Sequence, residues 1–168
     1  CSSQFFSLIP VDAQGEPTAR MQVWMSRRGL PHARKLLEET PDALFSFLDI
    51  HGAPPFGSDS LSHALYLREE RPDVWNRTRA LLEPADFLTL QFSGEITSNL
   101  CSAFPLMLTD NRDLSHGRWS AELLELTGIT QDHLAPLRPV DAQVGTVRDD
   151  VADSIGLPRN LPVYGGIN

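Results

Sequence analysis

The sequence predicts a mixed fold of the α/β or α+β class, in which a β-hairpin leads into a long helical stretch before the chain returns to strand. Three observations support this order. An apolar run at 5–11 is separated by a turn-rich loop from an alternating segment at 20–25. Prolines and glycines then divide residues 31–128 into segments of helical length. Short apolar runs follow at 144–147 and 162–164.

The first two segments are expected to pair as the strands of a β-hairpin with a loop longer than two residues. Met21, Val23 and Met25 alternate with polar residues, so they share one face of the second strand. The loop between the strands, Asp12–Pro17, is rich in turn-forming residues.

Residues that begin or end helices divide the central stretch. We expect helices over 31–40, from a cap at Ser58 or Asp59 up to Pro72, from Pro72 through Leu81–Leu82, from Pro84 to the C-cap Gly94, and from Ser120 to Gly128.

The last third of the chain is expected to return to strand. Thr146 and Asp149 have capping-box spacing for a helix that Gly156 ends. Pro162–Tyr164 is then expected to be a short buried strand that runs into the pair Gly165–Gly166.

Composition limits the classes of protein that this chain can represent. Its 168 residues suffice for one domain with a core, and 41% apolar against 21% charged residues excludes global disorder. The net charge of -8 argues against a nucleic-acid partner. No apolar run is long enough for a bilayer and no signal-peptide pattern occurs, so we expect no membrane partner. Two cysteines are too few for a disulfide framework, which favours a reducing cytoplasm.

Both ends of the sequence look internal to a longer protein. The chain starts without Met and runs directly into strand-like residues, and residues 162–168 stop in mid-pattern. We therefore expect further sequence on both sides.

Spacing alone identifies little chemistry. GxSxG, Walker A and GxGxxG motifs are missing. Gly165–Gly166 could let a phosphate or sugar approach the backbone, or could be a simple strand-end turn. Trp24 and Trp119 are interpreted as core residues more readily than as ligand-stacking residues. The histidines lack metal-ligand spacing and are expected on helix surfaces or in loops: His32, His51, His63, His116 and His133.

An ordered series of weak motifs carries more information. Leu82–Glu95 is similar to a helix written pkDyl…lTGe, and Thr97–Ala103 with Leu108–Asp110 is similar to tD.s.As…l.D. Trp119–Ile129 is similar to W…LL..lGi. The remaining matches are Ser2–Ser7 with SGQmhg, Asp12–Gly15 with d.dG, Trp24–Arg28 with W.D.R, His63–Pro72 with Kl.Wl.e..P, and Gly145–Val147, Gly156–Pro158 and Leu161–Val163 with G.v…GLp.g.PV. In this order the motifs resemble the FGGY family of carbohydrate kinases, and xylulokinases in particular.

The resemblance implies an α/β fold of the actin-like (ribonuclease-H-like) ATPase type. Residues 1–168 would be part of the N-terminal domain, a β-hairpin plus a helical insertion that returns to the sheet. The first phosphate-binding strands and the C-terminal nucleotide domain would lie outside this segment. The family transfers the γ-phosphoryl group of ATP, with Mg²⁺, to a hydroxyl of a small-molecule ketose or polyol.

The resemblance also implies where the site lies. The catalytic base is the Asp of a GxxD or GxGD motif after the PV strand, expected immediately after Asn168, so no catalytic residue and no metal ligand is expected within the chain. Gly165 and Gly166 would form cleft backbone. The residues carried over as substrate-binding are Gln4, Phe5, Phe6, Trp24, Ser26 and Arg28. For Gln4 and Arg28, backbone satisfaction and a structural ion pair remain the alternatives.

Four positions depart from the family pattern. Ser26 replaces the Asp of W.D.R, and Phe6 replaces a sugar-side His of xylulokinases, which makes d-xylulose a less favoured substrate. His63 replaces the signature Lys and Tyr66 its Trp. A family member that has lost catalysis and serves in sugar binding or regulation is therefore the second hypothesis. An actin-like ATPase unrelated to sugars is the third, and a homodimer is left open.

Overall fold

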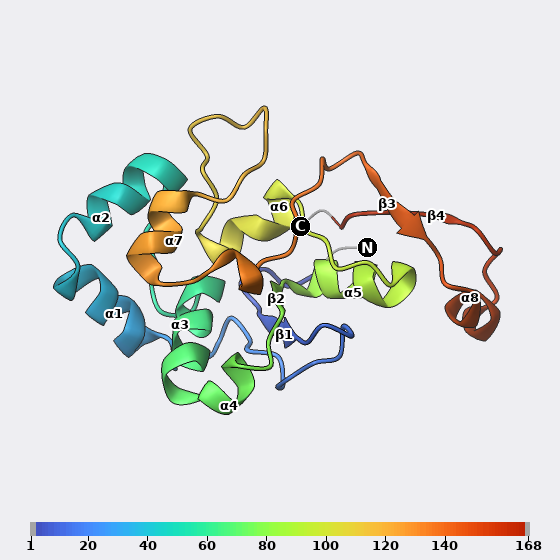
Figure 1. Ribbon diagram of the computed structural model, residues 1–168, viewed down its shortest axis with the longest axis horizontal. Coiled ribbons are helices and arrows are strands. Elements are labelled where there is room, and N and C mark those ends of the chain that lie inside the picture. The colour runs from blue at the N-terminus through green and yellow to red at the C-terminus, as the bar shows by residue number, and fades with distance from the viewer. Residues whose placement is uncertain (1–2, 167–168) are drawn as a thin grey trace.

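The computed structural model describes residues 3–166, which form helices packed around short strands (Figure 1). The helices and strands are β1 Ile9–Val11, α1 Leu30–Glu39, α2 Ala43–Ser46, a π-helical turn Phe47–His51, α3 Ser60–Glu70, α4 Pro72–Trp75, β2 Ala80–Leu82, α5 Pro84–Ser93, α6 Leu100–Ala103, a 3-10 turn Phe104–Leu106, α7 Ala121–Thr127, a 3-10 turn Gln131–His133, β3 Gln143–Thr146, α8 Asp149–Ile155 and β4 Pro162–Tyr164. Among these helices, none has the length and hydropathy needed to cross a membrane.

The first sheet consists of β1 and β2 in antiparallel register, with Ile9 opposite Leu82. The prediction that Leu81–Leu82 continue the helix begun at Pro72 is therefore wrong. All residues of both strands are buried, so their backbone groups need partners inside the protein, and the antiparallel pairing supplies them.

The predicted hairpin survives only as isolated contacts. Leu8 and Gln22 exchange two backbone hydrogen bonds of 2.8 Å, and the N–H of Thr18 donates to Pro10 O at 2.9 Å. Residues 20–25 form no regular strand. Pro17 stands opposite Val11 in an isolated bridge, and because proline has no N–H, the ladder is not continuous at this point.

The helix ends in the middle of the chain follow local signals. Of the two candidate caps for α3, Asp59 is the one used, and its carboxylate accepts from Ser62 N at 2.8 Å. Gly94 ends α5 with a φ of 80°, and Ser120 caps α7 by accepting from Leu123 N. These predictions are confirmed.

The predicted cap of the last helix is wrong. Arg148 is the N-cap residue of α8 and makes no side-chain cap hydrogen bond. Thr146 is the last residue of β3 and pairs with Pro162 of β4, so its backbone is engaged in the sheet. Gly156 ends α8 as predicted.

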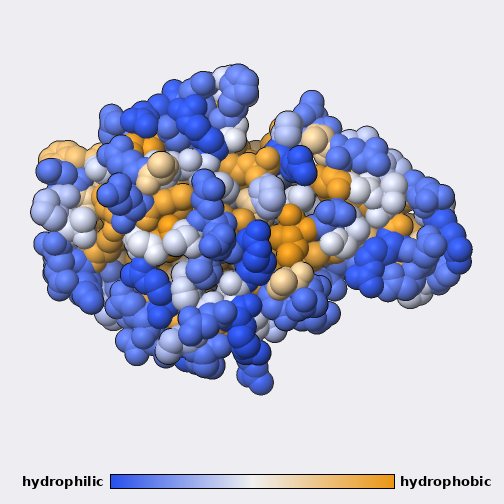
Figure 2. All heavy atoms as spheres, viewed as in Figure 1, coloured by the Kyte–Doolittle hydropathy of each residue, from blue (hydrophilic) through white to orange (hydrophobic). Residues whose placement is uncertain are grey.

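The second sheet, β3 with β4, lies with α8 at one side of the molecule, beside α5 (Figure 1). The strand prediction for Pro162–Tyr164 is confirmed, but the prediction that it is buried is wrong, because Pro162 and Tyr164 are exposed. Hydrophilic residues cover the outer end of this projecting part, and apolar residues gather nearer the middle of the same face (Figure 2).

The main core fills the space between α3, α4, α7 and the segment after α6. Trp75 belongs to it and stacks on the ring of His133 with centroids 4.1 Å apart. Trp119 packs against it, and its Nε1–H donates to Ala135 O at 3.1 Å. Both rings are thus packing residues. A smaller cluster of buried side chains joins β1, β2 and α5: Ile9, Val11, Ala80, Leu82, Leu90 and Ala135.

A loop between α6 and α7 protrudes from the body and is fastened at its base (Figure 1). The buried carboxylate of Asp110 accepts hydrogen bonds from Arg112 at 2.9 and 3.0 Å and from Arg118 at 2.8 and 3.1 Å. These two guanidinium groups hold the pKa of Asp110 well below its ordinary value. Thr109 and Trp119 pair in a bridge beside them.

Candidate functional site

The glycine pair after β4 is packed tightly against two helix starts. Asn99 Nδ2–H donates to Gly166 O at 2.9 Å. A Cβ on Gly165 would lie 2.9 Å from Asn99 Nδ2, and one on Gly166 would lie 2.7 Å from the Cβ of Ala85. Both approaches are shorter than real Cβ contacts, so these two glycines, called the glycine pair below, accept no side chain unless a neighbour moves.

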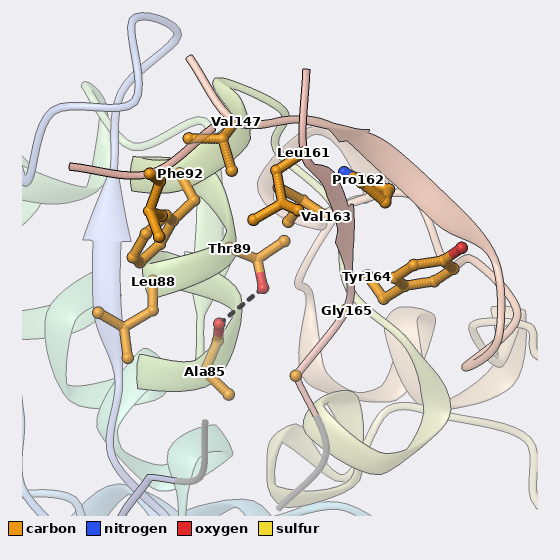
Figure 3. Close-up of a pocket in the computed structure, with 12 residues that line it drawn as sticks. Ala85, Leu88, Thr89, Phe92, Val147, Leu161, Pro162, Val163, Tyr164 and Gly165 are labelled. Carbon is orange, nitrogen blue, oxygen red and sulfur yellow. Dashed lines mark hydrogen bonds between the residues drawn. The ribbon is translucent and has the colours of Figure 1, made fainter. Parts of the chain in front are cut away.

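A groove of about 440 Å³ runs from the glycine pair between α5 and the β3–β4 pair (Figure 3). Leu88 and Phe92 of α5 form one wall, and Val147, Leu161 and Val163 form the other (Figure 3). Thr89 Oγ1 is already engaged, because it donates to Ala85 O at 3.0 Å. Walls of this kind bury apolar surface and do not match the hydroxyls of a polyol.

The predicted residues Phe5 and Phe6 belong to an aromatic group. Their rings are 4.7 Å apart, Phe6 is 5.1 Å from Phe56, and Phe5 stacks on Phe104 at 6.3 Å. Next to Phe104 lies the ring of His51, 4.6 Å away. Gln4 precedes this group and is exposed.

The rings of Phe5, Phe104 and His51 border a second cavity, of about 570 Å³. Its lining is mainly apolar, and its polar groups come from His51 and Asn111. Asn111 Nδ2–H donates to His51 O at 2.8 Å, so this amide is already bound. The lining residues are Phe5, His51, Leu100, Cys101, Phe104, Asn111, Leu114 and Val140.

The other predicted residues lie around the turn that follows Gln22. Ser26 N–H donates to Val23 O at 2.8 Å and closes the turn. Trp24, at the turn, is 45% exposed, so its interpretation as a core residue is wrong. The guanidinium of Arg28 lies 5.9 Å from the centre of the Tyr66 ring, in cation–π geometry.

The loop before α3 joins the two groups of predicted residues. Phe56 contacts Phe6, and a Cβ on the next residue, Gly57, would lie 2.6 Å from Leu30, close to Arg28 in sequence. The carboxylate of Asp59 fixes this loop by accepting from Phe56 N at 2.7 Å and from Gly57 N at 2.9 Å. This loop therefore contacts Phe6 on one side and Leu30, two residues after Arg28, on the other.

Three of the histidines differ from expectation. His32, His51 and His63 are buried, because each lies on the inner side of its element. Burial lowers the pKa of both His51 and His63 below the ordinary value. His51 Nδ1 lies 3.2 Å from Thr109 Oγ1. Burial thus disfavours the charged form of His51 and His63, whereas His32 Nδ1 lies 3.2 Å from a carboxylate oxygen of Glu69. The expectation of surface or loop histidines is wrong for all three.

Two buried carboxyls at the junction of β2 and α5 went unnoticed in the sequence. Glu83 accepts from Ser7 N at 3.2 Å and from Ser60 Oγ, and burial raises its pKa to about 8. Asp86 accepts from Ser98 Oγ at 2.7 Å, and burial raises its pKa to about 6. The signal available was Asp86 itself, which matches the Asp of the pkDyl motif.

The same junction brings the two ends of the described chain to one region. Glu83 binds Ser7, which follows the aromatic group, and Ala85 contacts Gly166. The first residues of α5 therefore lie between the segment that carries Phe5 and Phe6 and the glycine pair Gly165–Gly166. Sequence reasoning also missed Asn99; its only signal was an Asn at the start of a short helix with Ser102 three residues on.

A Mg²⁺ ion is bound by several carboxylate or other oxygen ligands. Within residues 3–166, no three His, Cys, Asp or Glu side chains gather in a way that could hold a metal ion. The described residues thus do not fit a Mg²⁺ site of their own.

With this geometry, the class of protein can be compared with known families. A model of the N-terminal domain of the FGGY family of carbohydrate kinases matches residues 1–168. The chain therefore belongs to that family, and the predicted fold, α/β and actin-like, is confirmed.

Individual relatives differ in the compound that gives them their names. A xylulose kinase of Streptomyces coelicolor is 30% identical over 92% of this chain and 31% of its own. A xyloylose kinase from Brucella ovis aligns with a TM-score of 0.82 at 25% identity, covering 98% of this chain and 32% of its own. A gluconate kinase from Lactobacillus acidophilus aligns with a TM-score of 0.86 at 14% identity, covering 99% and 33%, and supports the fold alone. The chain spans about a third of the length of the relatives it matches.

Proposed function

We propose that the full-length protein is an ATP-dependent carbohydrate kinase that phosphorylates a hydroxyl of a ketose or polyol. The observation that carries the proposal is the family match over residues 1–168. The glycine pair after β4 adds support, because its crowded backbone suits a segment that must hold one conformation. We place the protein in the cytoplasm, with a small-molecule sugar as partner and neither nucleic acid nor membrane; a homodimer is compatible with it.

In the proposed reaction the sugar hydroxyl attacks the γ-phosphorus of ATP. The O–H proton passes to a carboxylate base that we place immediately after Asn168, the bond between the γ-phosphorus and the bridging oxygen breaks, and ADP leaves. This chemistry depends on positioning. The backbone of Gly165–Gly166 would hold the base near the sugar, and Mg²⁺ would be bound outside the described residues.

The substrate-binding side is proposed to include Gln4, Phe5, Phe6, Trp24, Ser26 and Arg28. Phe6 packs on Phe56 and offers no hydrogen bond where xylulokinases have a His. Arg28 is exposed beside Tyr66, so its guanidinium can donate to sugar hydroxyls. This combination favours a substrate other than d-xylulose.

A panel assay tests the proposed function. Full-length protein with Mg-ATP is incubated with ketoses, sugar acids and polyols, and ADP release and phosphorylated product are measured together. We expect one sugar class to give product at least 100-fold above the sugar-free rate. Sugar-independent ADP release without any phosphorylated sugar would contradict the proposal.

The second candidate is a catalytically inactive family member that binds a sugar or regulates another protein. The replacements at Phe6 and Ser26 favour it. The two candidates are separated by the residue after Asn168, which the first requires to be a carboxylate. They are also separated by calorimetry, since sugar binding without product formation in the panel assay supports the second.

A further inference from the structure

Asn99 uses both halves of its side-chain amide. Its Oδ1 accepts from Cys101 N at 2.9 Å and from Ser102 N at 3.2 Å, which caps α6. Ser102 Oγ accepts from Asn99 N at 3.2 Å and completes a capping box. Nδ2 is left to donate to Gly166 O at 2.9 Å. The side chain is 2% exposed, so water competes poorly for either bond.

The cap is itself anchored to α5. Ser98 Oγ donates to Asp86 Oδ2 at 2.7 Å and lies 3.1 Å from Ser102 Oγ. Backbone hydrogen bonds join Ser98 to Pro136 and Arg138. Asn99 is therefore held from several sides, and a bond from its amide fixes the position of whatever it reaches.

The Asn99 amide reaches the glycine pair that follows β4. Ala85 limits Gly166 from one side and Asn99 from the other. Capping needs only the oxygen of the Asn99 amide, and several residues supply such an acceptor. The N–H donor is a separate requirement that Asp cannot meet, since a carboxylate would face the Gly166 carbonyl with like partial charge.

We propose that Asn99 is a positioning residue: its amide N–H holds the backbone of Gly166 and so sets the place of the residue that follows Asn168. This inference rests on the proposed function, in which that residue is the base. Asn99 touches no reacting atom and acts through the backbone of Gly166.

The test uses the full-length protein with Asn99→Asp and Asn99→Ser, which both keep a capping oxygen. The matched control is Ser120→Ala, which removes the cap of α7. This helix is also short, and it does not contact the glycine pair through its cap. Steady-state kinetics, melting temperature and hydrogen–deuterium exchange of the peptide covering 162–166 are measured for all four proteins.

We expect both Asn99 variants to lose about 10- to 100-fold in kcat, because a small displacement of a reacting group is enough for such a loss. KM should stay within about twofold and the melting temperature no lower than that of Ser120→Ala, while exchange over 162–166 becomes faster. Ser120→Ala should keep wild-type kcat and wild-type exchange at this peptide.

Wild-type kcat in the Asn99 variants, or a kcat loss that Ser120→Ala reproduces, would overturn the positioning role. Unchanged exchange at 162–166 would overturn it as well. A wild-type protein that phosphorylates no sugar would instead refute the proposed function. The exchange measurement would still decide whether the Asn99 amide holds the backbone of Gly166.

Discussion

Glu83 and Asp86 lie three residues apart in the sequence, and both carboxyls are buried. Burial disfavours the charged form, which raises the pKa of Glu83 to about 8 and that of Asp86 to about 6. The folded state therefore holds these protons more tightly than the unfolded chain. The associated stability is complete at pH values below the ordinary carboxyl pKa and is lost as pH rises through the folded-state pKa.

The first prediction concerns this pH dependence. The free energy of unfolding of the full-length protein should fall between pH 5 and pH 8, at most about 1.4 kcal/mol per pH unit for one group. Glu83→Gln should flatten the profile up to pH 8, and Asp86→Asn only up to pH 6. Urea unfolding at several pH values measures it. Glu38→Gln, on the exposed side of α1, controls for loss of one charge, and an equal flattening there would contradict the assignment.

The second prediction separates a binding role from a packing role. Arg28→Ala should lower kcat/KM by about 1.5–3 kcal/mol of transition-state stabilisation with little change in melting temperature, because the side chain is exposed. Trp119→Ala should lower stability by about 3 kcal/mol, because its ring packs on the core. Kinetics and thermal unfolding are compared for both variants. If Arg28→Ala unfolds early and keeps normal kinetics, the arginine is structural.

At the scale of the elements, α1 and α3 pack closely enough to require glycine at one point. A Cβ on Gly29 would lie 2.6 Å from the backbone of Ser62 at the start of α3. The backbone there cannot yield as a flexible side chain would, so the two helices would have to separate. Gly52 offers a comparison, since its φ is 98° but a Cβ would meet nothing within 4 Å.

The third prediction follows from that contrast. Gly29→Ala should destabilise the protein by up to about 3 kcal/mol through overpacking, and Gly52→Ala by about 1 kcal/mol through backbone strain alone. Urea unfolding of both variants gives the comparison. A Gly29→Ala protein as stable as the Gly52→Ala protein would show that α1 and α3 separate without penalty.

The elements also show what the sequence could and could not reveal. Helix ends at Asp59, Gly94 and Gly128 were predictable because a cap depends on residues within one turn. β2 was not, because its partner β1 lies some seventy residues earlier and nothing local distinguishes a short buried strand from a helix. The candidate site differs from the helix ends: Phe5 and Phe6 entered it through the family resemblance and stay a prediction, whereas the bond from Asn99 to Gly166 depends on the tertiary fold and has no local signal.

At the scale of the whole molecule, the chain corresponds to about a third of each relative. The groove beside α5 and the cavity beside Phe104 are mainly apolar, and the described residues gather no metal-binding cluster. Neutralising three phosphates requires cationic groups, backbone N–H donors or a metal held at short range.

The fourth prediction is that residues 1–168 alone bind Mg-ATP no more tightly than about millimolar and phosphorylate nothing, because phosphoryl transfer needs those groups. Titration calorimetry of the isolated segment, with the full-length protein as the positive control, measures it. Saturable micromolar binding by the segment alone would contradict the prediction.

The loop fastened by Asp110 has a consequence for sequence change. Arg112 and Arg118 hold the two sides of the loop together at its base, and Leu114 near its tip is 66% exposed. Because closure entropy grows only with the logarithm of length, doubling such a loop costs roughly 0.6 kcal/mol. Added residues at the tip would therefore cost little closure entropy, so this is a place where the protein can accept an epitope, or acquire a new recognition segment in evolution, while the base of the loop stays fastened.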